Sequence, residues 1–99
     1  MNCESLIKPP KSRVLKSGKV LLKPGESVGE HVTEKREEII IVLKGTATII
    51  AEGSQKTIET KGFCYIKEGV VHNVVNNSKD ELEYVYVVSL FDQISLKNP

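Results

Sequence analysis

Residues 25–45 read GESVGEHVTEKREEIIIVLKG, and this stretch carries most of the information about the fold. It begins at Gly25, a residue typical of turns, continues through a polar segment that contains His31 and Thr33, and ends in an apolar run over 39–43 before Gly45. A short apolar run bounded by turn residues is typical of a β-strand with little exposure. Working outward from this run, the rest of the chain repeats the same arrangement of short apolar segments between turns.

These strand-like runs recur every eight to twelve residues, which is typical of a β-sandwich or barrel. The composition agrees, because Val, Ile and Thr make up about a quarter of the 99 residues while Ala occurs twice and Met once. No segment of helix length remains between the turns. We therefore predict one all-β domain over residues 1–99, with a lead over about 1–12 and a tail over 91–99. We expect strands near residues 14–15, 19–22, 29–33, 38–43, 46–51, 57–60, 63–66, 72–75 and 82–90.

Charge and segment composition exclude several classes of partner. The formal net charge of +1 gives no general electrostatic reason to bind nucleic acid. The sequence has neither a signal-peptide pattern nor an apolar run of about 18 residues, so we expect a cytoplasmic protein that contacts no membrane. The cysteines, Cys3 and Cys64, are too few for a disulfide scaffold. Basic residues cluster near the start, where we interpret them as a solvated sheet edge: Lys8, Lys11, Arg13, Lys16, Lys19 and Lys23.

Two segments share a motif-like spacing around the chain's two histidines. The first spells G-x5-H-x-T-x4-E-x6-G from Gly25 through His31 and Glu38 to Gly45. It resembles the first cupin motif, with Thr33 where that motif has its second His. The second segment, GFCYIKEGVVHNVVN over 62–76, is similar to the second cupin motif through Gly69-x2-His72-x3-Asn76, although Lys67 replaces the customary Pro and the leading Gly62 falls one residue late. The chain is thereby identified as a small single-domain cupin, and the resemblance implies an antiparallel β-barrel or jelly roll, also called a double-stranded β-helix.

The resemblance also implies a metal site. Its ligands would be His31, Glu38 and His72, and they would hold a divalent ion such as Fe, Mn, Ni, Co, Cu or Zn inside the barrel. Two imidazoles and one carboxylate leave coordination positions open for a substrate. Residues two apart on a strand point the same way, so His31 and Thr33 share a face. Glu37 competes with Glu38 for the carboxylate position, because the strand is apolar on both faces and its alternation does not choose between them.

Three functional classes remain open from the sequence. The first is a metal-dependent protein that binds or acts on a small organic molecule, in a dioxygenase-like or sugar-isomerase-like manner. The alternative is a metal-free binding or sensory module, in which the histidines only hydrogen-bond to Glu38 or Thr33 as a satisfied polar cluster. A purely structural dimerisation domain is the third. No residue is assigned as catalytic, and no organic cofactor site is predicted.

Residues outside the motifs have simpler interpretations. Asn76 is expected to open a turn with Asn77 and Ser78. Tyr84 and Tyr86 share one strand face, and they and Tyr65 are interpreted as packing residues rather than as site residues. The runs 39–43 and 85–88 are apolar on both faces, which in an antiparallel sheet indicates a cover on the outer face. We expect a second subunit to be that cover, and hence a homodimer.

Overall fold

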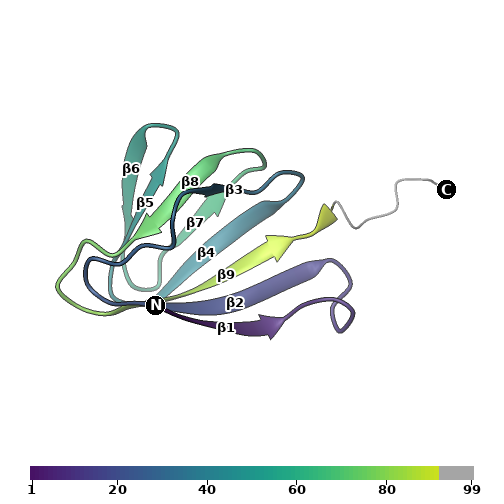
Figure 1. The fold of residues 1–99 in the computed structure, drawn as a ribbon, viewed down its shortest axis with the longest axis horizontal. Helices are drawn as coiled ribbons and strands as arrows, with labels where there is room; N and C mark the ends of the chain where they lie inside the picture. The colour runs from purple at the N-terminus through teal and green to yellow at the C-terminus, as the bar shows by residue number, and fades with distance from the viewer. Residues whose placement is uncertain (92–99) are drawn as a thin grey trace.

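The computed structural model describes residues 1–91, and this part of the chain folds into nine strands (Figure 1). Each strand is an alternating apolar segment that ends at a turn, as the sequence predicts. Their bounds are β1 Asn2–Ile7, β2 Leu15–Leu22, β3 His31–Val32, β4 Glu37–Lys44, β5 Ala47–Ala51, β6 Ser54–Ile58, β7 Phe63–Ile66, β8 Val71–Val75 and β9 Leu82–Ser89. In this part of the chain, none of the elements is a helix with the length and apolar character that crossing a membrane requires.

The strands form two antiparallel sheets. The larger sheet has the order β1-β2-β9-β4-β7, and the smaller has the order β3-β8-β5-β6. Neighbours in these sheets are mostly far apart in sequence, and the apolar core lies between the two layers, with Leu22, Ile40, Val42 and Leu82 fully buried. This arrangement confirms the predicted all-β, antiparallel jelly-roll class, built as two facing sheets rather than as one closed sheet.

Strand β4 shows why the larger sheet has two different faces. Its burial alternates residue by residue, so Glu38, Ile40 and Val42 point into the core while Glu37, Ile39 and Ile41 are exposed. Successive side chains on a strand point to opposite faces. The alternation therefore assigns the two adjacent carboxylates, with Glu38 inside and Glu37 outside.

Cross-strand register lines up residues of three strands on the inner face. Glu38 of β4 pairs with Val88 of β9, and Val88 pairs in turn with Lys16 of β2. The next inner row, one step along the strands, contains Gly18 and Tyr86. These two rows are important because they place residues of β2 and β9 on the same face as Glu38.

Two residues stabilise the turns at the ends of strands, Asn76 through its side-chain hydrogen bonds and Gly45 through its backbone conformation. The Asn76 amide is fully buried, donates to the carbonyls of Leu22 and Asp80, and accepts from the backbone N–H and hydroxyl of Ser78. This confirms Asn76 as a turn residue. Gly45 has φ +86°, and a Cβ there would lie 2.5 Å from the Glu81 carbonyl, so this position accepts only glycine without backbone movement.

Several strand predictions need correction. The lead over 1–12 contains β1, an edge strand with all six residues exposed that pairs with β2 through its backbone, so no apolar alternation marks it. The predicted strands 14–15 and 19–22 are one strand, β2. The predicted strand 29–33 is formed only over β3, and β6 begins earlier than expected, directly after the two-residue turn Glu52-Gly53, in which both residues have positive φ. Residues 92–99 of the predicted tail lie outside the described residues.

Candidate metal centre and ligand cavity

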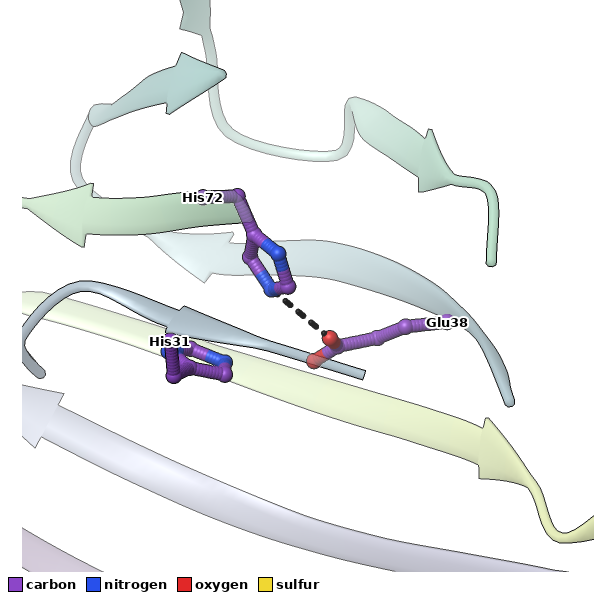
Figure 2. Close-up of side chains that lie close together, drawn as sticks. All are labelled: His31, Glu38 and His72. Carbon is purple, nitrogen blue, oxygen red and sulfur yellow. Dashed lines mark hydrogen bonds and ion pairs between the residues drawn. The ribbon is translucent and has the colours of Figure 1, made fainter. Parts of the chain in front are cut away.

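Three side chains from three strands converge between the two sheets. His31 comes from β3, His72 from the neighbouring β8 and Glu38 from β4 of the other sheet (Figure 2). One ligand atom from each of the three lies within 4.8 Å of the others. We call these three residues the His–Glu cluster. Its members are the same three residues that the motif spacing selects from the sequence.

His72 is the most buried member, with 1% of its surface exposed. Its Nδ1 lies 2.9 Å from the Val70 carbonyl, which can only accept, so Nδ1 carries a proton. Its Nε2 lies 3.1 Å from Oε1 of Glu38, the contact drawn as a dashed line in Figure 2. Burial is the largest influence and lowers the pKa of His72, but the hydrogen bonds to Glu38 and Val70 and the charge of Glu38 together outweigh it and raise the pKa. Without a metal, a hydrogen bond through one proton between Nε2 of His72 and Oε1 of Glu38 thus holds the two side chains together.

His31 repeats this arrangement at a more exposed position. Its Nδ1 lies 3.0 Å from the carbonyl of Gly29, two residues earlier, just as Nδ1 of His72 binds the carbonyl two residues before it. The two rings lie with their centroids 4.2 Å apart and their planes tilted by 59°. Backbone carbonyls that hold Nδ1–H leave Nε2 as the free donor atom, which is the usual way in which proteins orient metal-binding imidazoles.

The distances in the His–Glu cluster fit a small divalent ion. Two ligand atoms that bind one ion at right angles, each at about 2.1 Å, lie about 3.0 Å apart. The contact between His72 and Glu38 has this length. Opposite ligands of the same ion are at most about 4.2 Å apart, so the cluster limit of 4.8 Å requires only a small inward movement, for which the exposed His31 has the most freedom.

Thr33 leaves one buried polar atom without a partner. Its Oγ1 is shielded from solvent and makes no hydrogen bond within residues 1–91. It lines the same cavity as His31 and Glu38. A buried hydroxyl without a partner is uncommon and costs about 1–3 kcal/mol. Because Thr33 lines the cavity, the residue that interrupts the motif still offers a polar group to the site.

Glu37 takes no part in the cluster. It faces outward on β4 and accepts a hydrogen bond of 2.7 Å from the Tyr65 hydroxyl. This hydrogen bond is the main reason why the pKa of Tyr65 is raised. Glu37 is therefore a matched comparison residue for Glu38, because it is the same residue type, one position earlier, on the opposite face of the sheet.

A cavity of about 320 Å³ adjoins the His–Glu cluster. Two cluster members and Thr33 line one side, and Tyr84, Tyr86 and Lys16 line the β2–β9 side. From the sequence, Tyr84 and Tyr86 are interpreted as packing residues and Lys16 as part of a solvated sheet edge, so these three residues were not assigned to the site. Burial is the main cause that raises the pKa of both Tyr84 and Tyr86, and the nearby Glu38 carboxylate adds to it. Both phenols therefore keep their protons at neutral pH and can donate hydrogen bonds to a ligand.

A second cavity, of about 380 Å³, lies between β5–β6 and β7. Its lining includes Cys64, Lys56 and Lys67, and no member of the His–Glu cluster lines it. Burial raises the pKa of the Cys64 thiol, which agrees with an inert core residue. Although this second cavity is slightly larger, the chemistry is concentrated in the first.

The fold and the cluster together define an antiparallel jelly roll with a candidate two-histidine, one-carboxylate metal centre. Residues 18–88 match the family model for the cupin domain, Cupin_2. The chain belongs to the cupin domain family, as the two motif-like segments predict.

Individual relatives are similar in the same region. Mannose-1-phosphate guanylyltransferase of Salmonella montevideo is 35% identical over 71 residues, which are 72% of this chain and 15% of that protein. Oxalate-binding protein of Thermotoga maritima is 32% identical over 69 residues, which are 70% of this chain and 57% of that protein. The chain therefore spans less than two thirds of the length of either relative.

Solved structures agree with the fold. A predicted oxalate decarboxylase from Thermotoga maritima superposes with a TM-score of 0.82 at 26% identity, covering 89% of this chain and 78% of that one. A cupin 2 conserved barrel domain protein from Salinispora arenicola gives a TM-score of 0.81 at 22% identity, covering 93% and 77%. The second similarity is one of fold alone.

Proposed function

We propose that this cupin binds a divalent metal ion through His31, Glu38 and His72 and uses the adjoining cavity to bind a small organic acid. One observation carries the proposal: both imidazoles are held through Nδ1 by backbone carbonyls, which leaves Nε2 of each ring to act as the ligand atom, beside a buried carboxylate and a cavity of metabolite size. Binding is the step shared by the oxygenase-like and isomerase-like reactions expected from the sequence.

The chain's own residues would supply orientation and shielding. The carbonyls of Gly29 and Val70 hold the two rings, and the buried position of Glu38, 7% exposed, fixes its carboxylate opposite them. The metal, when bound, would act as a Lewis acid that attracts and polarises a ligand oxygen. Tyr84 and Tyr86 would then donate hydrogen bonds to the remaining ligand oxygens from the other side of the cavity.

The nature of the relatives supports an acidic ligand. A similar sequence and a similar structure from Thermotoga maritima carry the descriptions oxalate-binding protein and predicted oxalate decarboxylase. Oxygen-rich anions are also the ligands expected for a site that combines a divalent ion with phenolic donors. A small carboxylate satisfies both considerations.

Metal analysis of the purified chain tests this proposal. After incubation with Zn²⁺ or Mn²⁺ and removal of free ion, we expect about one ion per chain in the wild type and in Glu37→Gln, the outward-facing control. Glu38→Gln and His72→Ala should lose it. A wild-type chain that retains no stoichiometric metal, or a His31→Ala, His72→Ala double variant that retains it, would overturn the assignment of the site.

A metal-free binding module is the second candidate. It is favoured by the hydrogen bond between His72 and Glu38, which gives each buried group a partner without any ion. In that case a small carboxylate such as oxalate would bind the chelator-treated chain as tightly as the metal-treated chain. The proposal above expects the opposite, because binding should require the ion.

We also propose that a second copy of this chain covers the outer face of the larger sheet. Register places exposed and half-buried apolar residues side by side there, with Ile39 between Tyr65 and Val87, and Ile41 between Phe63 and Val85. Phe63 is 66% exposed and Tyr65 53%. Contiguous exposed apolar surface of this kind marks interaction sites, and a stable dimer needs about 800 Å² from each partner.

The oligomeric state tests this second proposal. Sedimentation equilibrium should give a dimer for the wild type and a monomer for Ile41→Glu, because the new charge would be buried without a partner. Val71→Glu is the control, since Val71 is 47% exposed on β8 of the other sheet. A wild-type monomer at high protein concentration would refute the proposed interface.

A further inference from the structure

We propose that Lys16 and Tyr86 form an anion subsite opposite the His–Glu cluster, which makes the cavity selective for a dicarboxylate over a monocarboxylate. This inference rests on the proposed function, because one carboxylate of the ligand would bind the metal and the other would bind this subsite. The argument uses the inner face of β2, which no motif marks.

Lys16 is a cation on the inner face of a strand. Val20 and Leu22 lie on the same face of β2 as Lys16, and both are buried in the core, which shows that this face is turned inward. Lys16 makes no ion pair with any residue in 1–91, whereas Lys19 on the outer face of the same strand lies within salt-bridge distance of Glu4 and Glu83. The inner lysine is therefore available to an anion in the cavity, and the outer one is not.

Tyr86 lies across β2 at the adjacent inner position. A Cβ on Gly18 would lie 2.5 Å from the Tyr86 hydroxyl and 2.7 Å from the ring carbon that bears it. The ring therefore occupies the space that a side chain at position 18 would fill. Residues two apart on a strand are about 6.7 Å apart on the same face, so the Tyr86 hydroxyl and the base of the Lys16 side chain occupy neighbouring positions in the lining of the same cavity.

The sheet register separates the two anion-binding points of the cavity. Lys16 and Glu38 belong to one cross-strand row and are separated by β9, so their backbones are about 10 Å apart. A ligand that bridges the metal and the Lys16 ammonium therefore needs an anionic group at each end.

Charge favours a dianion in the same space. Arg36 also lines the cavity. A divalent ion and Glu38 sum to one positive charge, and Lys16 adds a second on the other side of the cavity. A dicarboxylate neutralises both, while a monocarboxylate leaves the Lys16 ammonium without a partner. Ionic hydrogen bonds of this type are the strong ones in proteins.

Calorimetric titration of the Zn²⁺-loaded chain tests the subsite. Succinate should bind at least tenfold more tightly than butyrate, which has the same length and one carboxylate. Lys16→Gln and Tyr86→Phe should each weaken succinate by about five- to tenfold, with the Zn²⁺ affinity unchanged. Lys19→Gln and Tyr65→Phe are the matched outer-face controls and should bind succinate like the wild type.

A third variant addresses the position of the ring. Gly18→Ala keeps every polar group but forces Tyr86 to move, so succinate affinity should fall while the Zn²⁺ affinity stays. Equal binding of succinate and butyrate by the wild type, or Lys16→Gln and Tyr86→Phe variants that behave like their controls, would overturn the subsite and leave the metal proposal intact. A wild-type chain that takes up no Zn²⁺ would overturn both.

Discussion

Two substitutions in the metal-free chain should separate the structural role of the His72–Glu38 contact from its role as a metal site. His72→Ala leaves the buried Glu38 carboxylate and the Val70 carbonyl without their partner. Each such group costs about 1–3 kcal/mol, so we expect a loss of about 3 kcal/mol in the free energy of unfolding. For a domain of this size that lowers Tm by about 12–24 °C.

Glu38→Gln should behave differently. The His72 ring keeps its Nδ1–H on the Val70 carbonyl, so Nε2 of the neutral ring can accept a hydrogen bond from the new amide. We expect a loss below about 1 kcal/mol, because a hydrogen bond is exchanged rather than removed. The same variant should lose the stabilisation that the wild type gains from Zn²⁺, which is about 2.7 kcal/mol when the free ion is at one hundred times its Kd.

Thermal and urea unfolding followed by circular dichroism, with chelator and then with Zn²⁺, measures both effects. Glu37→Gln is the control, since that carboxylate faces outward. If Glu38→Gln destabilised the metal-free chain as much as His72→Ala does, the buried contact would not be the exchangeable hydrogen bond described above. If Zn²⁺ stabilised Glu38→Gln and wild type equally, the carboxylate would not be a ligand.

Three other changes have defined outcomes. Thr33→His should tighten Zn²⁺ binding at least tenfold, because position 33 lines the cavity and a second imidazole on that segment completes a four-ligand set; an unchanged Kd in a competition titration would mean that this side chain does not reach the ion. Tyr84→Phe should reduce the alkaline loss of stability: the folded pKa of Tyr84 is raised, so its contribution is complete below the unfolded pKa of 10.0 and falls by about 1.4 kcal/mol per pH unit above it. The difference in the free energy of unfolding between pH 9 and pH 11 should therefore be smaller in this variant than in the wild type. An equal difference in both proteins would count against the burial of the phenol. Asn76→Ala should cost about 2–4 kcal/mol in urea unfolding through its four lost hydrogen bonds, with Zn²⁺ affinity retained, and a loss below 1 kcal/mol would show that the turn is held by other contacts.

The sequence predicted the fold and the cluster because both depend on local spacing. The distance from His31 to Glu38 and the position of His72 are properties of short segments, and the strand alternation around them is readable residue by residue. Strand alternation did not choose between Glu37 and Glu38, since Ile39, Ile40 and Ile41 are identical on both faces of the strand, and only the motif spacing favoured Glu38. Pairing with β7 and β9, and packing of the smaller sheet against one side only, made that choice.

The β2–β9 side of the cavity could not be predicted for a related reason. Lys16 and Glu38 are far apart in sequence, and only the register of β9 between their strands brings them into one row. Gly18 reads as a break between two short strands, whereas in the structure the Tyr86 ring covers it and β2 continues. Edge strand β1 was missed because backbone pairing, rather than burial, defines it.

The unequal anchoring of the two histidines has a consequence for the order of assembly. His72 and Glu38 already touch across the gap between the sheets, while His31 belongs to a strand of two residues that pairs only with β8. An ion would thus bind the preformed pair of His72 and Glu38 first and His31 last. Once bound, it would link the shortest strand, β3, to the opposite sheet. Chelation should then free this strand before any other, and faster amide exchange at Val32 would report it.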